Sequence, residues 1–441
     1  MSIAIIQSRD PLRDRRVVRL LRVLRAGGLT SPSQAGGRGV AGAVASIIRQ
    51  VAADGDEALV KLAWRFDKAR LTAQTLAVPA GAIRAATAGA EADFLALARR
   101  VIANIRQYQE HILIRPPAVL TRGGRELGVR YTPIGRVGVY VPGRRAMYPS
   151  TMLMTIVPAQ VAGVREIALA SPPAANGDVN PMVLALAGEL GITEVYRAGG
   201  AQAIAAMAMG TKTIRAVDKI VGPGNAYVTE AKRQLFGRVG IDSTAGPSEV
   251  MIVADETAKA DWLAADMLAQ AEHDPGSAIL VTPSARLAKA VAGEIARQLP
   301  SLNRSAAARA CLRAYGAIIV TADLATACAV ADEFAPEHLQ IVTAEDSAVL
   351  AMIRNAGAIF LGAETPVPLG DYYAGPSHVL PTGGTGRFFS ALSCNDFLKA
   401  SSVIRYDAAA LAEDAADVID FATREGLTAH AAAIDVRGKR N

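Results

Sequence analysis

The 441-residue chain carries 47 Lys and Arg against 41 Asp and Glu, and 51% of its residues are hydrophobic. This length predicts two or more domains, and the balance is that of a globular protein. Outside the N-terminal region the positive charge does not concentrate into a nucleic-acid footprint. No apolar run reaches the roughly 18–20 residues of a membrane span, and three cysteines without paired spacing indicate a reducing cytoplasm.

Residues 1–26 predict a helical arm. In the stretch "RDPLRDRRVVRLLRVLR" arginines recur against leucines, a pattern typical of an amphipathic surface helix. Asp10 and Asp14 interrupt the basic charge, and no small-residue cleavage site follows an apolar core, so a targeting peptide is not favoured. Residues 40–115 continue as several helices, with Ala, Leu and Ile at helical spacing.

Beyond residue 135 short apolar runs alternate with helical patterns, for example near 150–163, 180–190 and 201–209. This alternation predicts a parallel sheet with crossover helices, and it occurs twice. The expected strands are 136–141, 166–171, 194–199 and 218–223 in the first set, and 249–255, 277–283, 315–322, 339–344 and 357–362 in the second.

The sequence thus predicts an α/β fold of two Rossmann-like units with small helical segments at both ends. The expected domains are the arm 1–26, a Rossmann-like domain 136–248, a second α/β domain built from 27–135 with 249–392, and a tail 393–441. We expect the early helices to pack on the second unit, and the helical tail to dock elsewhere or on a partner subunit. Ligands of open α/β sheets lie beyond the carboxyl ends of strands, where we expect the notable polar residues.

The stretch "DEFAPEHLQI" places Glu337 and His338 side by side, behind Pro336 and before an apolar run. One interpretation is a turn whose polar groups are solvated. The other is an acid/base pair, because an imidazole that titrates near pH 7 can exchange protons with substrate. Pro336 fixes its own φ and restricts the residue before it, which would hold the pair in one direction.

Three other segments combine a histidine with a carboxylate or amide. They are Gln270 with His273 in "AQAEHD", Asp371 with His378 in "GDYYAGPSHVLPTGGTGRF", and Glu425 with His430 in "EGLTAH". Each alone is most simply a structural histidine or a surface loop. Together they offer nitrogen and oxygen donors without sulfur, which suits a catalytic zinc that keeps coordination positions open.

Two backbone-rich loops follow strands of the first set, "GGAQAIAAMAMGT" and "VGPGNAYV". Both fit the approach of a phosphate to the N-terminus of a helix. Neither contains the G-x-G-x-x-G fingerprint, so by themselves they support a dinucleotide only weakly.

Ten motifs in order give the chain a close resemblance to the histidinol dehydrogenase family, over nearly all of its length beyond about residue 40. They are "RVGVYVPG", "YPSTMLM", "GGAQAIAAMAMGT", "DKIVGPGNAYV", "GIDSTAGPSEV", "AQAEHD", "FAPEHLQI", "GAIFLG", "GDYYAGPSHVLPTGGTGRF" and "EGLTAH".

The resemblance implies an enzyme that uses zinc, one ion per subunit, and NAD. It would oxidise L-histidinol to L-histidine through L-histidinal with two NAD, as the final steps of histidine biosynthesis in the cytoplasm. It also implies two aldehyde-dehydrogenase-like units and a homodimer whose C-terminal tail completes the partner's active site. No nucleic-acid or membrane partner is expected.

The resemblance assigns roles by motif. The implied zinc ligands are Gln270, His273, Asp371 and His430, which also touch substrate, and the acid/base residues are Glu337 and His338. The other implied substrate contacts are Ser248, His378 and Glu425, and the NAD contacts are Tyr140, Gln202 and Asn225.

The order of the two oxidations suggests how the pair divides its work. His338 would accept the alcohol proton, and Glu337 would activate the water that hydrates the aldehyde. A thiolate could replace that water. Cys394 is the only plausible candidate, because Cys311 and Cys328 lie in apolar helical patterns and are expected in the core.

Three positions depart from the family pattern: Arg144 replaces a common glycine, Ser377 a common asparagine, and "FLKASS" lacks a Lys-Arg pair. They keep open a paralogue that oxidises another small polar alcohol. A zinc hydrolase without NAD, in which Glu337 activates water, and a non-catalytic binding protein are the alternatives from other classes.

Overall fold

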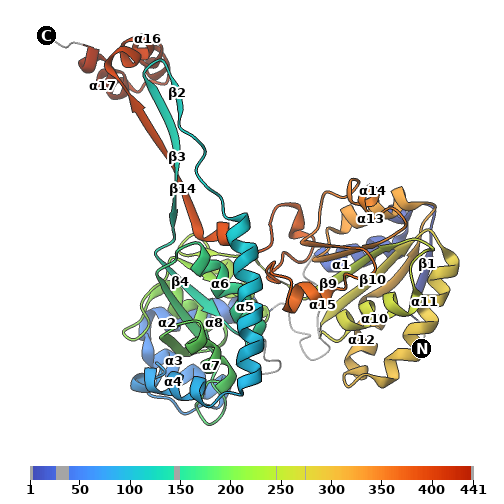
Figure 1. Ribbon diagram of the computed structural model, residues 1–441. Coiled ribbons are helices and arrows are strands. Elements are labelled where there is room, and N and C mark those ends of the chain that lie inside the picture. Colours follow the sequence, from blue (N-terminus) through green and yellow to red (C-terminus); the bar gives the residue numbers. More distant parts are fainter. Residues whose placement is uncertain (1–2, 26–38, 144–148, 245, 274, 439–441) are drawn as a thin grey trace. The chain divides into compact units, whose positions relative to one another are not determined.

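The computed structural model describes residues 3–25, 39–143, 149–244, 246–273 and 275–438 (Figure 1). They form two compact units, one from Met1–Ile112 with Gly135–Asp396, the other from Leu113–Ile134 with Phe397–Asn441. The expected tail boundary at residue 393 lies close to this division. The placement of residues 113–134 in the second α/β domain was wrong, because these residues pair with the C-terminal segment.

The first sheet of unit 1 has five parallel strands in the order β6-β5-β4-β7-β8. The order reverses between β4 and β7, as in a Rossmann-like unit. The strands are β4 (Arg136–Tyr140), β5 (Glu166–Ser171), β6 (Glu194–Arg197), β7 (Lys219–Val221) and β8 (Gly240–Ile241). The four expected strands are confirmed, and β8, with two residues, is too short to leave an apolar run.

Helices cover both faces of this sheet (Figure 1). The crossover helices are α6 (Pro149–Val161), α7 (Pro181–Glu189), α8 (Gly200–Met209) and α9 (Ala226–Leu235). The early helices are α2 (Val40–Asp54), α3 (Asp56–Leu62), α4 (Ala80–Ala88) and α5 (Ala92–Ile112).

The early helices pack on the first sheet, so the expectation that they pack on the second was wrong. Val44, Ile47 and Val51 of α2 share one apolar core with Ile204 of α8 and Val228 of α9. An amphipathic pattern tells which face of a helix is buried, but it does not tell which sheet buries it.

The second sheet has six parallel strands in the order β1-β11-β10-β9-β12-β13. From β11 to β13 it repeats the order of the first sheet, which confirms two Rossmann-like units. The strands are β1 (Ala4–Gln7), β9 (Ser248–Ala254), β10 (Gly276–Thr282), β11 (Gly316–Val320), β12 (His338–Val342) and β13 (Ala358–Leu361). All five expected strands are confirmed, and β1 was missed.

Alternate residues of the second sheet face two cores. One core lies under α10 (Ala260–Ala271), α11 (Ala285–Gln298) and α12 (Ser305–Tyr315), and the other under α1 (Arg15–Arg25), α13 (Leu324–Phe334) and α14 (Asp346–Leu350). α1 confirms the amphipathic arm, since Val17, Leu21 and Leu24 are buried there. Among the described residues, no helix combines the length and apolar character that crossing a membrane requires.

Unit 2 is an antiparallel ribbon that carries two helices at one end (Figure 1). Its elements are β2 (Leu120–Arg122), β3 (Arg125–Pro133), β14 (Leu398–Tyr406), α16 (Ala408–Arg424) and α17 (Thr428–Gly438). Arg125 holds α16 through hydrogen bonds to Asp414 and Glu413. The expected tail is α-helical only from Ala408 onward, because β14 pairs with a strand far away in the sequence.

Candidate active site and dinucleotide edge

The Glu337–His338 pair lies at the amino end of β12, where the chain leaves α13. Ala335 ends that helix in the left-handed region, at φ 48°, and Pro336 follows. A left-handed non-glycine residue is strained, and such strain collects at functional sites. Ala335 is thus left-handed although it precedes a proline. The turn is fixed, because the carbonyls of Pro336 and Glu337 accept hydrogen bonds from the N–H groups of Gly357 and Ala358.

The polar residues around this turn lie at the amino ends of their strands. Ser248 begins β9, His338 begins β12, and His273 precedes Gly276, the first residue of β10. The expectation that they lie beyond the carboxyl ends was wrong for this sheet. The carboxyl-end rule describes most open α/β sheets, and sequence alone does not reveal an exception.

The carboxylate of Glu337 is held by two donors from the start of β9. Its Oε2 accepts a hydrogen bond of 2.7 Å from the Ser248 hydroxyl and another of 2.7 Å from the Glu249 backbone N–H. The Glu337 side chain is 9% exposed. Hydrogen bonds to an ionised group are short and strong, so the carboxylate is fixed in one orientation.

One ring nitrogen of His338 is committed to the backbone. Nδ1 lies 2.9 Å from the carbonyl oxygen of Glu249, and a carbonyl can only accept, so Nδ1 carries a proton. In the neutral ring Nε2 therefore holds the lone pair. Nε2 is buried, lies 3.5 Å from Oδ1 of Asp371, and has no hydrogen-bond partner among the described residues. In the neutral tautomer Nε2 is therefore the nitrogen that accepts a proton.

Burial lowers the pKa of His338, but the Glu337 and Asp371 carboxylates more than offset this and raise it above its usual range. Burial also disfavours the charged form of Asp371, which acts to raise its pKa. The contact with His338 outweighs this effect, so the pKa of Asp371 is lowered. The imidazole beside these carboxylates thus binds protons firmly. A cation bound by Asp371 would neutralise one of those charges and free Nε2 to act as a base.

Of the expected metal donors, Asp371 and His273 interact with this pair. Gln270 is in the last turn of α10 and 3% exposed, and its amide Nε2 has no hydrogen-bond partner among the described residues. His273 follows the helix, and burial lowers its pKa while Glu337 and Asp371 act to raise it. Burial of the imidazole favours the neutral form that binds metals. The neutral His273 imidazole and the Asp371 carboxylate fit a cation that binds nitrogen and oxygen ligands, and Gln270 could add its amide oxygen.

This donor set is incomplete by itself. No group of three or more His, Cys, Asp or Glu in the described part of the chain forms a metal site. The fourth expected ligand, His430, lies in α17 of unit 2, and Glu425 ends α16 of the same unit. Both are exposed there.

His378 uses both ring nitrogens within unit 1. Nδ1 lies 2.9 Å from the backbone oxygen of Asp371 and donates to it, while Nε2 lies 3.2 Å from the Thr151 hydroxyl on α6. Burial lowers its pKa. His378 therefore orients α15 (Val367–Tyr372), which carries Asp371. Thr151 lies in the motif "YPSTMLM" but was not singled out from the sequence.

Sequence reasoning also missed Glu249. It is 4% exposed, and its Oε1 accepts a hydrogen bond of 3.1 Å from the Gly383 N–H. Burial, with the Glu337 charge, raises its pKa to about 8. A carboxyl group at the start of the apolar strand "SEVMIVA" was the available signal, since buried glutamates are rare.

The residues expected to contact a dinucleotide lie at the carboxyl edge of the first sheet. Tyr140 ends β4, Gly222 follows β7, and these strands flank the reversal in strand order where dinucleotides bind. A Cβ on Gly222 would lie 2.2 Å from the Tyr140 carbonyl oxygen. The Tyr140 hydroxyl accepts a hydrogen bond of 3.1 Å from the N–H of Gly200, at the start of α8.

Two helix N-termini open at this edge. Asn225 caps α9, where its Oδ1 accepts from the N–H groups of Tyr227 and Val228, and Gln202 is buried in the first turn of α8. Partial positive charge at helix N-termini and close backbone approach at glycines suit a pyrophosphate. The three expected contacts therefore lie on one edge, and that edge fits NAD.

The cysteines are unsuited to covalent catalysis. Cys394 is fully buried, its Sγ donates to the Gln109 carbonyl oxygen, and burial raises the pKa of the thiol. A buried thiol of raised pKa is a poor nucleophile. Cys311 and Cys328 are buried as expected.

Two departures from the family pattern have structural surroundings. The Ser377 hydroxyl donates to the Met154 carbonyl and accepts from the Val379 N–H. "FLKASS" begins with buried Phe397 and continues in β14. Arg144 lies outside the described residues.

A buried acid/base pair on one Rossmann-like sheet and a dinucleotide edge on another define an oxidoreductase. The family model for histidinol dehydrogenase matches residues 32–438. A histidinol dehydrogenase of Rhodopirellula baltica is 52% identical over 394 residues, 89% of this chain and 86% of the relative. One of Geobacillus kaustophilus is 51% identical over 90% of this chain and 93% of its own length.

Among solved structures, the crystal structure of histidinol dehydrogenase from Elizabethkingia anophelis superimposes with a TM-score of 0.90 at 32% identity, and the match covers 100% of this chain and 99% of that one. The chain belongs to the histidinol dehydrogenase family.

Proposed function

We propose that the protein oxidises L-histidinol to L-histidine through L-histidinal with two NAD, in the cytoplasm, as the closing steps of histidine biosynthesis. The observation that carries this proposal is the His338 imidazole, whose Nδ1 is tied to the Glu249 carbonyl while buried Nε2 is left to accept a proton. Family membership supports the substrate, and the first sheet supports the cofactor.

His338 acts in the first oxidation. As hydride leaves the alcohol carbon for the nicotinamide, the hydroxyl proton passes to Nε2, and the aldehyde forms. The backbone hydrogen bond at Nδ1 keeps the ring in the required tautomer and stabilises the imidazolium that results. NAD supplies hydride acceptance when it is bound.

Glu337 acts in the second oxidation. The aldehyde carbon keeps one hydrogen, but its loss as hydride would leave an unstable acylium cation, so water must first add to the carbonyl carbon. The Glu337 carboxylate takes a proton from that water, and the resulting hydrate anion can lose hydride to leave a carboxylic acid. Ser248 and the Glu249 N–H keep the carboxylate aimed during both steps. No thiol is needed.

Gln270, His273, Asp371 and His430 would hold zinc. The ion supplies a fixed positive charge that orients the imidazole and amino groups of the substrate. Ser248, His378 and Glu425 would complete the substrate contacts, with the Glu425 carboxylate suited to an ammonium group. Tyr140, Gln202 and Asn225 would contact NAD.

A homodimer would supply the missing donors. Glu425 and His430 are exposed on unit 2, and apolar side chains around them are exposed too, with Phe421 at 71% and Leu427 at 43%. We infer that unit 2 reaches the active site of a second copy. Mixing inactive His273→Ala and His430→Ala chains should then restore part of the activity, because one of two hybrid sites is intact. Verified heterodimers without activity would contradict this sharing.

The assay that tests the proposal follows NADH formation with histidinol, histidinal and unrelated small alcohols. We expect NADH from the first two only, loss of activity on removal of metal by a chelator, and recovery with zinc. Selective turnover of another polar alcohol would indicate the paralogue, and hydrolysis without NADH would indicate a zinc hydrolase. Full activity of a metal-free sample would contradict the zinc site.

A further inference from the structure

A buried ion pair lies beside the glycine turn that follows β7. Lys232 on α9 and Asp242 after β8 have side chains only 3% and 4% exposed, and Nζ lies 2.6 Å from Oδ1. Withdrawing two charges from water costs about as much as their attraction returns, so such pairs seldom add net stability over apolar packing. The other bonds that the pair makes are therefore of interest.

Both charged groups hold Gly222. Lys232 Nζ donates to the Gly222 carbonyl oxygen at 2.5 Å, and the Gly222 N–H donates to Asp242 Oδ2 at 2.7 Å. Gly222 has φ 109°, which other residues rarely adopt. A single residue is thus fixed through both of its backbone polar groups by oppositely charged partners.

We call the hydrogen bonds from Lys232 and to Asp242 the Gly222 clamp. The position of Gly222 means that this clamp acts on the loop that follows. The residue packs on the Tyr140 carbonyl at the reversal of strand order, and the chain from it runs through Pro223 and Gly224 to Asn225, the N-cap of α9. Its conformation therefore sets the direction in which this loop leaves the sheet. A loop already fixed in its binding conformation loses less entropy when a ligand binds.

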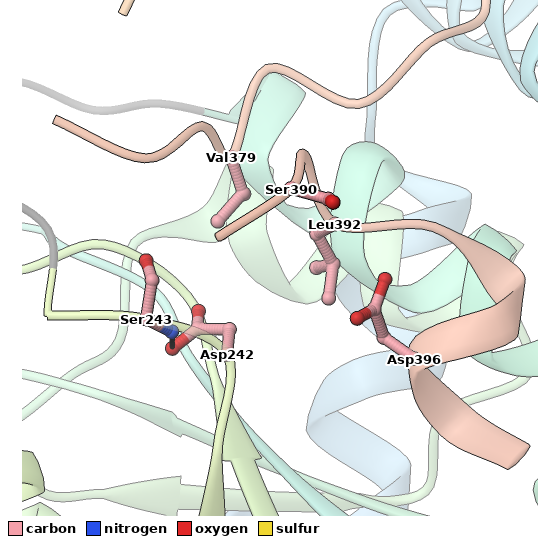
Figure 2. Close-up of a pocket in the computed structure, with 6 residues that line it drawn as sticks. All are labelled: Asp242, Ser243, Val379, Ser390, Leu392 and Asp396. Atoms are coloured by element: carbon pink, nitrogen blue, oxygen red, sulfur yellow. Dashed lines mark hydrogen bonds between the residues drawn. The ribbon is translucent and has the colours of Figure 1, made fainter. Parts of the chain in front are cut away.

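Asp242 is also anchored independently of Lys232 and Gly222. Asp242 and Ser243 border a small hollow whose opposite wall includes Val379, Leu392 and Asp396 (Figure 2). Asp242 Oδ1 also accepts a hydrogen bond of 2.8 Å from the Ser243 N–H. The carboxylate thus stays anchored when one of its partners is removed.

We propose that Lys232 and Asp242 are positioning residues that hold the loop from Gly222 to Asn225 ready for the dinucleotide. This inference rests on the proposed function, because it takes the ligand of this edge to be NAD. Both side chains are covered, so they act on the cofactor through Gly222 and not by contact.

The first test is Lys232→Met, measured as binding of NADH by its fluorescence. The variant removes the hydrogen bond from Lys232 to the Gly222 carbonyl. Asp242 still accepts hydrogen bonds from the N–H groups of Gly222 and Ser243. We expect the dissociation constant of NADH to rise about tenfold or more, because the loop must then be ordered on binding. Binding of L-histidinol to the zinc-loaded protein without nucleotide, measured by calorimetry, should stay within twofold of the wild type.

A second variant and a control separate positioning from folding. Lys232→Met with Asp242→Asn removes both charges, so neither member of the pair is left as a lone buried charge, and the same loss of NADH affinity is expected. Glu194→Gln weakens the ion pair with Arg136, whose side chain is 7% exposed at the amino end of β4. This control weakens an ion pair of the same sheet at its other edge and should leave NADH binding unchanged.

Wild-type affinity in both Lys232 variants would overturn the inference, as would an equal loss in Glu194→Gln. A wild type that binds no NADH would overturn the proposed function and this inference together. That result differs from one in which the wild type binds NADH and the variants bind it equally well, which would overturn the inference alone.

Discussion

The two sheets of unit 1 share one strand order but present their functional residues at opposite edges. In the first sheet Tyr140 and Gly222 follow the strands, at the carboxyl edge. In the second sheet Ser248 and His338 begin the strands, at the amino edge. Strand order alone therefore does not decide which edge of a Rossmann-like sheet becomes the site.

Helix dipoles give a physical reason for the difference. The carboxyl edge of the first sheet meets the N-termini of α8 and α9, whose partial positive charge favours phosphate. The amino edge of the second sheet meets the C-termini of α10 and α13, which end next to His273 and Glu337. Their partial negative charge favours a metal ion or a substrate ammonium.

Acidic side chains at the carboxyl edge of the second sheet disfavour a phosphate there. Asp255, after β9, accepts a hydrogen bond from the Ala344 N–H, and Asp346 accepts one from Thr343, after β12. These carboxylates occupy the N–H groups at the reversal of strand order. In the first sheet the comparable carboxylate, Asp242, is neutralised by Lys232.

The largest expected effect concerns the amino edge. His338→Asn should slow histidinol oxidation by about 10²–10⁴-fold, because no base takes the hydroxyl proton, while Glu337→Gln should chiefly slow oxidation of supplied histidinal. The ratio of the two half-reaction rates in each variant is the measurement, with NADH binding as the control. Equal losses in both half-reactions, with zinc and NAD bound, would show that the pair acts as one unit.

A smaller effect is expected at the carboxyl edge of the first sheet. Gly222→Ala should weaken NADH binding about tenfold or more, because its Cβ would meet the Tyr140 carbonyl at 2.2 Å and a strained backbone costs on the order of 1–3 kcal/mol. Gly237→Ala is the matched control, since Gly237 has φ 97° and no atom within 4 Å of an added Cβ. Equal losses in both variants would attribute the effect to general strain.

The smallest effect concerns the pH dependence of stability at the amino edge. Glu249 has an ordinary pKa of 4.5 when unfolded and about 8 when folded. Between these values the folded protein keeps a proton that the unfolded chain has lost, so the wild type loses stability as pH rises through this window.

Glu249→Gln removes this titration. In chelated samples its melting temperature relative to the wild type should therefore increase by roughly 1–3 °C between pH 5 and pH 8. A constant difference across that range would show that Glu249 is ionised throughout.

The strands of both sheets were predictable because buried parallel strands leave continuous apolar runs between turn residues. β1, β3 and β14 were not, because β1 pairs with a strand more than 300 residues away and the ribbon of unit 2 is largely exposed. Which sheet buries α2 also depends on contacts between distant segments.

The site was predictable in its residue types more than in its geometry. The motif around His338 suggested an acid/base pair, but the tautomer depends on the carbonyl of Glu249, 89 residues earlier. The clamp on Gly222 depends likewise on residues from α9 and from beyond β8. Such backbone contacts leave no periodic signal in a sequence.

Hydrogen–deuterium exchange with separate ligands tests most directly whether the two sheets bind at opposite edges. We expect NADH alone to protect backbone N–H groups at residues 199–203 and 221–228, and zinc with L-histidinol to protect 246–250, 268–277 and 335–340. Protection by NADH at the carboxyl edge of the second sheet, around Asp255 and Thr343, would contradict the account, as would protection of one common set of residues by both ligands.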